Sequence, residues 1–108
     1  MDDTSVDYDA RMAALAAAFA QALPEKRRAL QADWRAWQED GVAAARDALQ
    51  AQAHRLGGAA DNYGYVALGC AARALDALLV PRLGARPAAV ADAVAALIAA
   101  FEQPPEAD

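Results

Sequence analysis

The sequence predicts an all-α fold, an antiparallel four-helix bundle with one additional N-terminal helix. Apolar residues recur at steps of three and four almost throughout the 108 residues, and strand-type alternation of β-branched residues is missing. The length suits one small domain and leaves no room for a second. Hydrophobic residues make up 57% of the chain, but alanine supplies most of them and the mean hydropathy is +0.02, which is typical of helices that each carry a narrow apolar stripe.

The additional helix is expected at residues 9–22, after a flexible acidic segment at residues 1–8. Its apolar stripe consists of Met12, Leu15, Phe19 and Leu23. Pro24 is expected to end this helix and to lie in the first turn of the next, because proline has no backbone N–H to donate. The next helix is predicted at 24–38, with Leu30, Trp34 and Trp37 as its large apolar groups, and Gly41 marks the turn after it.

Three further helices complete the predicted domain, which spans residues 9–102. A long helix over 42–63 has the core stripe Val42, Leu49, Ala53, Leu56, Ala60 and Tyr63 and ends at a cap, Gly64. A helix over 65–80 turns Leu68, Ala72, Leu75 and Leu79 inward, and residues 81–87 form a loop. The last helix, over 88–101, buries Val90, Val94, Leu97 and Phe101, and residues 103–108 are expected to be a disordered acidic tail.

Charge and composition exclude several classes of function. The net charge of -5 and the pI near 4.7 disfavour nucleic-acid binding, because phosphates repel an acidic surface. The most apolar stretch, residues 88–101, is shorter than the roughly 20 residues of a spanning helix, and the acidic N-terminus is unlike a signal peptide, so we expect a cytoplasmic protein that does not bind membranes. One cysteine and one histidine are too few for a disulfide or a structural zinc site, and we expect no metal.

The single histidine, His54, is the most informative residue of the long predicted helix. A helical wheel places it roughly 130° from the centre of the core stripe, so it should face solvent. A lone helical histidine is usually incidental. The residues that share its face are small, however: Ala51, Gly57 and Gly58 flank it, with Gln50 and Asp61 at the margins.

Two consecutive glycines in the middle of a helix cost roughly 1 kcal/mol each relative to alanine. Gly57 lies nearer the core edge, where close approach of a neighbouring helix and an open surface are equally good explanations. Gly58 lies outward, where a partner molecule would benefit from the missing side chain. An exposed imidazole is largely neutral near pH 7, so His54 could act as a nucleophile, an acid or base, or a ligand, and a partner must complete any site.

The stretch AHRLGGAADNYGYVALGCAARALDALL resembles the histidine-containing phosphotransfer (HPt) domains of bacterial phosphorelays. Their pattern is close to A-H-x-L-K-G-x-[AS]-x-x-[LFY]-G, followed by a helix with L-x-x-x-[CA]-x-x-L-[ED]. The first part is matched by Ala53, His54, Leu56, Gly58, Ala60, Tyr63 and Gly64, and the second by Leu68, Ala72, Leu75 and Asp76. The helical layout of nearly the whole chain fits this family as well.

This resemblance implies a phosphocarrier. His54 would accept a phosphoryl group on its outer ring nitrogen from a receiver-domain aspartate and pass it to another, the partners being a hybrid histidine kinase and a response regulator. No cofactor is expected, since Mg²⁺ would belong to the receiver, and without a nucleotide-binding motif no autonomous kinase or hydrolase activity is expected. The expected docking residues are Gln50, Ala51, Arg55, Gly57, Gly58 and Asp61.

One position departs from the family, which usually has lysine where this chain has Gly57. Arg55 and Arg73 are candidates for supplying the missing charge near the phosphate, although a solvated surface arginine is the more common case for Arg73. Two other hypotheses stay open: a helical module that binds a receiver without phosphotransfer, and a structural bundle with an incidental histidine. We expect a monomer, because a bundle of this size can close its own core.

Overall fold

The structure of the protein is a computed structural model that describes residues 3–80, 84 and 86–106. It contains four α-helices and one 3-10 turn: α1 (Asp3–Asp40), α2 (Ala43–Ala59), η1 (Ala60–Tyr63), α3 (Val66–Leu79) and α4 (Pro87–Ala100). The described residues form no strand, so the predicted all-α class is confirmed. None of the described helices is long and apolar enough to cross a membrane. Of the predicted loop at 81–87, residues 81–83 and 85 lie outside the described part.

The N-terminal region differs from the prediction, because α1 is one helix of 38 residues that continues through Pro24. The separate helix expected at 9–22 is its first half, and the segment expected to be flexible is helical from Asp3 onward. Proline removes the hydrogen bond to the carbonyl of Ala20, which is why a break was expected. Ala20 and Pro24 are both exposed, so water can bond to that carbonyl, and alanine-rich sequence on both sides favours the helix.

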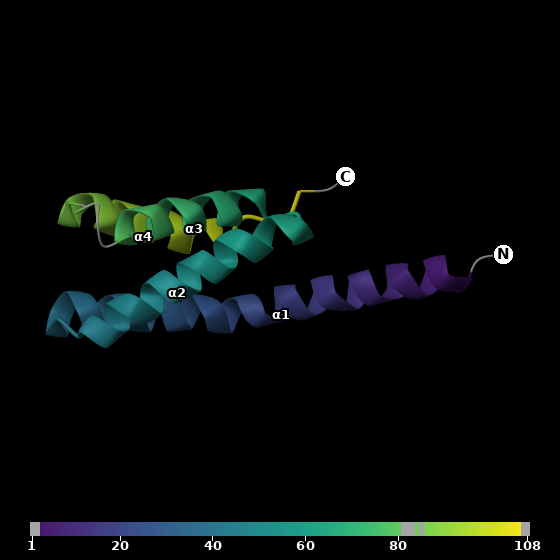
Figure 1. Cartoon of the computed structure of the whole chain (residues 1–108), viewed down its shortest axis with the longest axis horizontal. Coiled ribbons are helices and arrows are strands. Elements are labelled where there is room, and N and C mark those ends of the chain that lie inside the picture. Colours follow the sequence, from purple (N-terminus) through teal and green to yellow (C-terminus); the bar gives the residue numbers. More distant parts are fainter. Residues whose placement is uncertain (1–2, 81–83, 85, 107–108) are drawn as a thin grey trace.

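The chain turns back between successive helices, and α2, α3 and α4 gather beside the C-terminal half of α1 (Figure 1). The longest dimension of the molecule is 58 Å, which a helix of 38 residues nearly fills, at about 57 Å. Since α2 has 17 residues and α3 and α4 have 14 each, the other helices are too short to accompany α1 along its whole length. The N-terminal part of α1 therefore projects beyond the bundle (Figure 1).

The core is built from leucine, valine and alanine. Its largest fully buried side chains are Leu30, Leu49, Leu68, Leu75, Leu79 and Leu97. Ala53, Ala60 and Ala72 have no exposed surface, and such small side chains let neighbouring helices approach closely. Trp34 and Trp37 pack against the edge of this core, as expected.

Three of the residues predicted to lie in the core are exposed. Met12 is 36% exposed and Leu15 is 51% exposed, because they belong to the projecting part of α1, where no other helix reaches them. Val42 is 42% exposed at the residue before α2. Phe19 marks the edge of the bundle, since its ring lies 4.8 Å from that of Tyr63 and 5.4 Å from that of Tyr65.

The predicted cap at Gly64 is confirmed. The backbone of Gly64 has φ of 84°, and its N–H donates to carbonyls of the 3-10 turn that ends the helical stretch begun by α2. The left-handed conformation is one that glycine adopts without strain. The turn redirects the chain into α3, so α3 packs back along α2.

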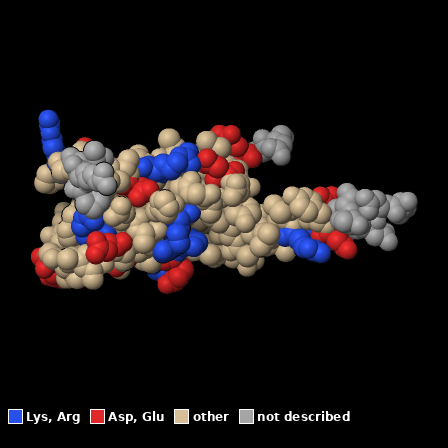
Figure 2. Space-filling model, in the orientation of Figure 1, with Lys and Arg blue, Asp and Glu red and all other residues tan. Residues whose placement is uncertain are grey.

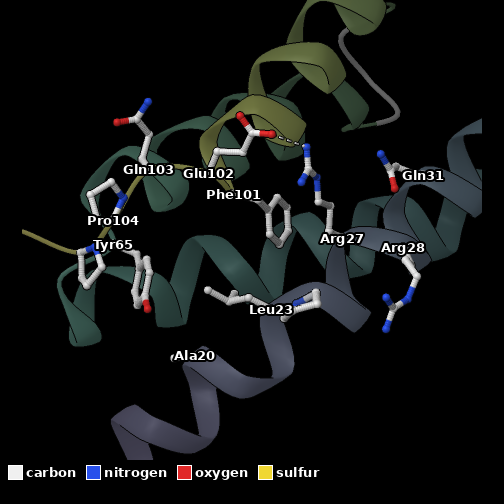
Figure 3. A pocket seen from close by; sticks show the side chains of 12 residues that line it. Ala20, Leu23, Arg27, Arg28, Gln31, Tyr65, Phe101, Glu102, Gln103 and Pro104 are labelled. Atoms are coloured by element: carbon white, nitrogen blue, oxygen red, sulfur yellow. Dashed lines mark hydrogen bonds and ion pairs between the residues drawn. The ribbon is translucent and has the colours of Figure 1, made fainter.

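The C-terminal segment was expected to be disordered from residue 103, but it lies against the bundle through Glu106. The Glu106 N–H donates to the carbonyl of Gly64 at 2.8 Å. Close by, Arg27 on α1 donates to Glu102 at 3.1 Å across a groove of about 680 Å³ (Figure 3). Prolines 104 and 105 line the same groove and restrict the backbone, which favours a fixed path. Residues 107–108 of the predicted tail lie outside the described part.

Replacing Gly64 by alanine is expected to lower the free energy of unfolding by about 2 kcal/mol. Alanine is strained at this φ, and its Cβ would lie 3.2 Å from the Glu106 carbonyl oxygen. Gly41→Ala is the matched control, since Gly41 has φ of 65° but nothing within 4 Å of an added Cβ, and about 1 kcal/mol is expected there. Urea unfolding followed by circular dichroism measures both. Equal losses would show that the contact with the C-terminal segment does not stabilise the fold.

Candidate functional site

His54 lies in the second half of α2, on the side that faces solvent. Its side chain is 77% exposed, whereas Ala53 next to it is completely buried. Leu49, Ala53 and Leu56 turn the opposite face of α2 into the core. The predicted orientation of His54 is confirmed, and no described helix of the chain covers it.

Asp76 on α3 lies opposite His54 and holds its ring. Nδ1 of His54 lies 2.9 Å from Oδ2 of Asp76, whose side chain is 24% exposed. An ionised carboxylate only accepts hydrogen bonds. Nδ1 therefore carries a hydrogen and donates a hydrogen bond to Asp76. In the neutral imidazole, the other ring nitrogen, Nε2, then keeps the lone pair that a nucleophile needs.

Gly57, one helical turn after His54, is where α3 comes closest to α2. Gly57 is buried, and a Cβ at this position would lie 2.7 Å from Cγ of Arg73 and 3.4 Å from its backbone nitrogen. Of the two explanations left open by the sequence, close approach of a neighbouring helix is therefore correct. Gly57 does not belong to the open surface, and the lysine usual at this position would collide with Arg73.

The side chain of Arg73 reaches from α3 to the backbone of α2 at this point. Its Nη1 donates to the carbonyl of Gly57 at 2.9 Å and to Oδ2 of Asp61 at 2.9 Å. The Asp61 carboxylate in turn lies against Gly69 on α3, where any side chain would collide with it. Arg73 is half-exposed, so it is a cation held at the surface by groups one and two turns beyond His54 on the same helical stretch.

These contacts follow a single register between two helices that run in opposite directions. Residues 54, 57 and 61 of the α2–η1 stretch lie opposite residues 76, 73 and 69 of α3. Steps of three and four keep all six residues on one face of each helix. The site is therefore a row of cross-helix pairs beside the exposed imidazole.

The surface around the His54 ring is bare on the α2 side. An added Cβ at Gly58 would meet nothing within 4 Å, and Ala51 and Arg55 are exposed. Gln50, predicted at the margin, is half-buried and accepts a hydrogen bond from Arg46 at 3.3 Å. Among the predicted docking residues, Ala51, Arg55 and Gly58 thus lie open around His54, whereas Gly57 is covered and Gln50 and Asp61 are engaged by arginines.

A groove on another part of the described surface holds no comparable chemistry. The groove of about 680 Å³ between α1 and the C-terminal segment is lined by apolar residues, prolines and the Arg27–Glu102 ion pair (Figure 3). It contains no residue of α2 and no pair of groups suited to proton transfer. Within the described ranges, no three histidine, cysteine or acidic side chains lie close enough to share a metal ion.

The family model of the Hpt domain matches residues 14–104. The chain belongs to the Hpt domain family. The match covers α2, α3 and α4 completely, and therefore includes His54 and the row of cross-helix pairs beside it. Hpt domains take part in phosphotransfer in two-component signalling, and they interact with receiver domains. Neither curated proteins nor solved structures give a significant match.

The sequence did not identify Asp76 as part of the site of this Hpt domain. In the sequence it is only the acidic residue that ends the second part of the motif, L-x-x-x-[CA]-x-x-L-[ED]. The available signal for Asp76 was its fixed place in the motif, on a helix that packs beside the helix of His54. The register of α2 against α3, which sequence spacing does not give, is what makes it the partner of His54.

Asp76→Asn is expected to shift the tautomer equilibrium of His54 toward the Nε2–H form by roughly fivefold or more, since a hydrogen bond to a charged group contributes about 1 kcal/mol or more. The asparagine amide can donate to Nδ1, which the carboxylate cannot. Imidazole nitrogen chemical shifts from ¹⁵N NMR measure the ratio. Asp47→Asn on the exposed surface of α2 is the control and should leave it unchanged; an unchanged ratio in Asp76→Asn would contradict the pairing.

Proposed function

We propose that this Hpt domain is a histidine phosphotransfer protein that relays a phosphoryl group between receiver-domain aspartates, with His54 as the phosphoacceptor. The observation that carries the proposal is the pair formed by the exposed His54 ring and Asp76 at 2.9 Å. It provides a fixed, unprotonated Nε2 on a surface that a partner can reach. An incidental histidine, the third hypothesis from the sequence, would have no need of this partner.

In the proposed step, Nε2 of His54 attacks the phosphorus of an aspartyl phosphate in line with the bond to the aspartate oxygen. The N–P bond forms as the P–O bond breaks, and the aspartate leaves as a carboxylate. Nδ1 keeps its proton, so the ring becomes cationic, and the Asp76 carboxylate stabilises that charge. The reverse attack by a second aspartate regenerates neutral His54 and completes the relay.

The docking face proposed for the receiver consists of Ala51, Arg55 and Gly58 around His54, with Gln50 and Asp61 at its margins. The absence of side-chain bulk at Gly58 supports close approach to the imidazole. Mg²⁺, bound by the receiver, would neutralise most of the phosphoryl charge, and this chain needs no cofactor of its own. Neither a kinase nor a hydrolase activity of the isolated chain is part of the proposal.

We further propose that Arg73 replaces the charge of the usual lysine. The guanidinium is held by the Gly57 carbonyl, one turn after His54, and by Asp61, two turns after it, at 2.9 Å from each. Arg55, the other candidate, is exposed and lies further round α2. A Cβ at position 57 would collide with the Arg73 side chain. Glycine at position 57 and arginine at position 73 therefore belong together, and as a pair they take the place of the family's lysine.

The remaining parts of the proposal concern the setting of the protein. The partners would be receiver domains of a hybrid histidine kinase, a response regulator or both, in the cytoplasm, without nucleic acid or membrane. The domain would run from about residue 9 to 102, with the second half of α1 and α2–α4 as an antiparallel four-helix bundle. The expectation of a monomer rests on a bundle that closes its own core, and Met12 and Leu15 of α1 lie outside that core.

The proposal is tested by incubating the wild-type chain and His54→Gln with a phosphorylated receiver domain. Wild type should acquire an acid-labile, base-stable label and His54→Gln none, because the amide of glutamine is not a nucleophile. Receiver binding is measured in parallel by titration calorimetry. Binding without label in wild type would favour the alternative, a module that docks on receivers without phosphotransfer. Label on His54→Gln would place the phosphoacceptor elsewhere.

Arg73→Gln should slow phosphotransfer by roughly 10-fold, because it removes a fixed positive charge near the phosphoryl group. Arg55→Gln, the matched loss of charge, should change the rate much less. Single-turnover rates from a phosphorylated receiver are measured at low and high salt. An effect of the lost charge depends on the salt concentration, whereas an effect of misfolding does not. Reinstating the family lysine by Gly57→Lys together with Arg73→Ala should restore most of the rate, whereas Gly57→Lys alone should destabilise the fold. Equal effects of the two arginine variants would contradict the assignment.

A further inference from the structure

The projecting part of α1 carries large apolar side chains in contact with solvent. Tyr8 is 62% exposed, Leu15 51% and Met12 36%. In the space-filling view the part of this segment next to the bundle is tan, and charged side chains appear only toward its outer end (Figure 2). Monomeric proteins rarely present a continuous apolar row of this kind without a partner.

The spacing of these residues specifies what fits them. Tyr8, Met12, Leu15 and Phe19 follow one another at steps of four, three and four, the spacing of the apolar seam in a coiled coil. A seam of this kind accepts the side chains of another helix between its own. The occupant is therefore an amphipathic helix rather than a strand or a small molecule.

The bundle covers this seam at one end only. Phe19 packs against Tyr63 at 4.8 Å and Tyr65 at 5.4 Å, and Leu23, which follows on the same face, is buried. From Leu15 toward the N-terminus the same face continues without a described neighbour. The family match begins at residue 14, so Tyr8 and Met12 lie outside the part that defines an Hpt domain.

We propose that a second copy of this chain covers the seam, so that the projecting segments of two α1 helices pair in a symmetric dimer. Each copy supplies an amphipathic helix of the right length and pattern, and one two-fold contact buries both seams together. The shared segment, about residues 3–18, is about 24 Å long. Such a helix is marginal alone in water, and pairing gives its apolar face the packing on which helix stability depends.

The two helices must run antiparallel. The face of α1 that carries the seam is also the face on which α2–α4 pack beyond Phe19. In a parallel pair, both bundles would occupy the space between the two α1 helices. In the antiparallel pair the bundles lie at opposite ends, and each projecting segment fills the space in front of the other copy's bundle.

The dimer leaves the proposed docking face open. Of the docking residues, only Arg55 lines a hollow together with a seam residue, Phe19. His54, Ala51 and Gly58 lie on the exposed side of α2, so each dimer would present two phosphoacceptors. The proposal does not depend on phosphotransfer, and its test has a separate readout.

Sedimentation velocity of the full chain at about 10 and about 200 µM tests the proposal. We expect a dimer at the higher concentration and a monomer for Met12→Glu with Leu15→Glu. The control is Ala13→Glu with Ala17→Glu, which adds the same charge on the opposite, exposed face of α1 and should leave the dimer intact. Helix content from circular dichroism verifies that the variants fold. A wild-type monomer at both concentrations, a dimer that survives the seam variant, or one lost in the control overturns the proposal.

The orientation has its own measurement. In a Cys70→Ser background, Tyr8→Cys would place two thiols side by side in a parallel pair and too far apart for a disulfide in the antiparallel one. Under oxidising conditions we expect no intermolecular disulfide. A disulfide-linked dimer would overturn the antiparallel arrangement.

Discussion

The close packing of α2 against α3 is the constraint on which the rest of the site depends. Gly57 and Gly69 have no side chains where the opposite helix approaches, and Ala53, Ala60 and Ala72 are fully buried. At this separation one register brings His54 to Asp76 and Arg73 to the Gly57 carbonyl. The two helices would lie further apart with larger residues at these positions, and both polar contacts would be lost. The glycines and alanines of the sequence are therefore part of the functional geometry rather than filler.

The charges of this site are distributed differently from what the sequence pattern alone suggests. The cation proposed to face the phosphate comes from α3 in place of α2, and it is held by a carbonyl and by Asp61 instead of extending freely. A tethered arginine loses less conformational entropy than a free lysine when it meets an anion. On the other side of His54, Asp76 fixes the protonated nitrogen. In the proposed transfer, the imidazole therefore lies between a group that balances the positive charge of the phosphorylated ring and a group that can balance the phosphate.

Helix α1 divides into two parts with different surroundings. Its C-terminal half is one wall of the bundle, with Leu23 and Leu30 in the core, and its N-terminal half carries the same apolar face beyond the other helices. Continuity through Pro24 makes this possible, since a break there would let the first half fold back onto the bundle. Pro24 is exposed, so water can bond to the carbonyl that loses its helical hydrogen bond. A buried proline at this place would disrupt the helix. The surface proposed for pairing and the surface proposed for phosphotransfer can thus coexist on a small chain.

The sequence by itself determined the helical class, the cap at Gly64, the core faces of the last three helices and the exposure of His54, because each depends on local periodicity or on one residue's backbone preference. It also identified the family through the residues around His54. Only the tertiary structure decided that α1 is continuous, that Met12 and Leu15 lie outside the core, and that Gly57 lies beneath Arg73. It likewise made Asp76 the partner of His54. These features depend on the relative lengths of the helices and on the register in which they pack. His54 and Asp76, which are 22 positions apart in the sequence, come into contact only when α2 and α3 pack together.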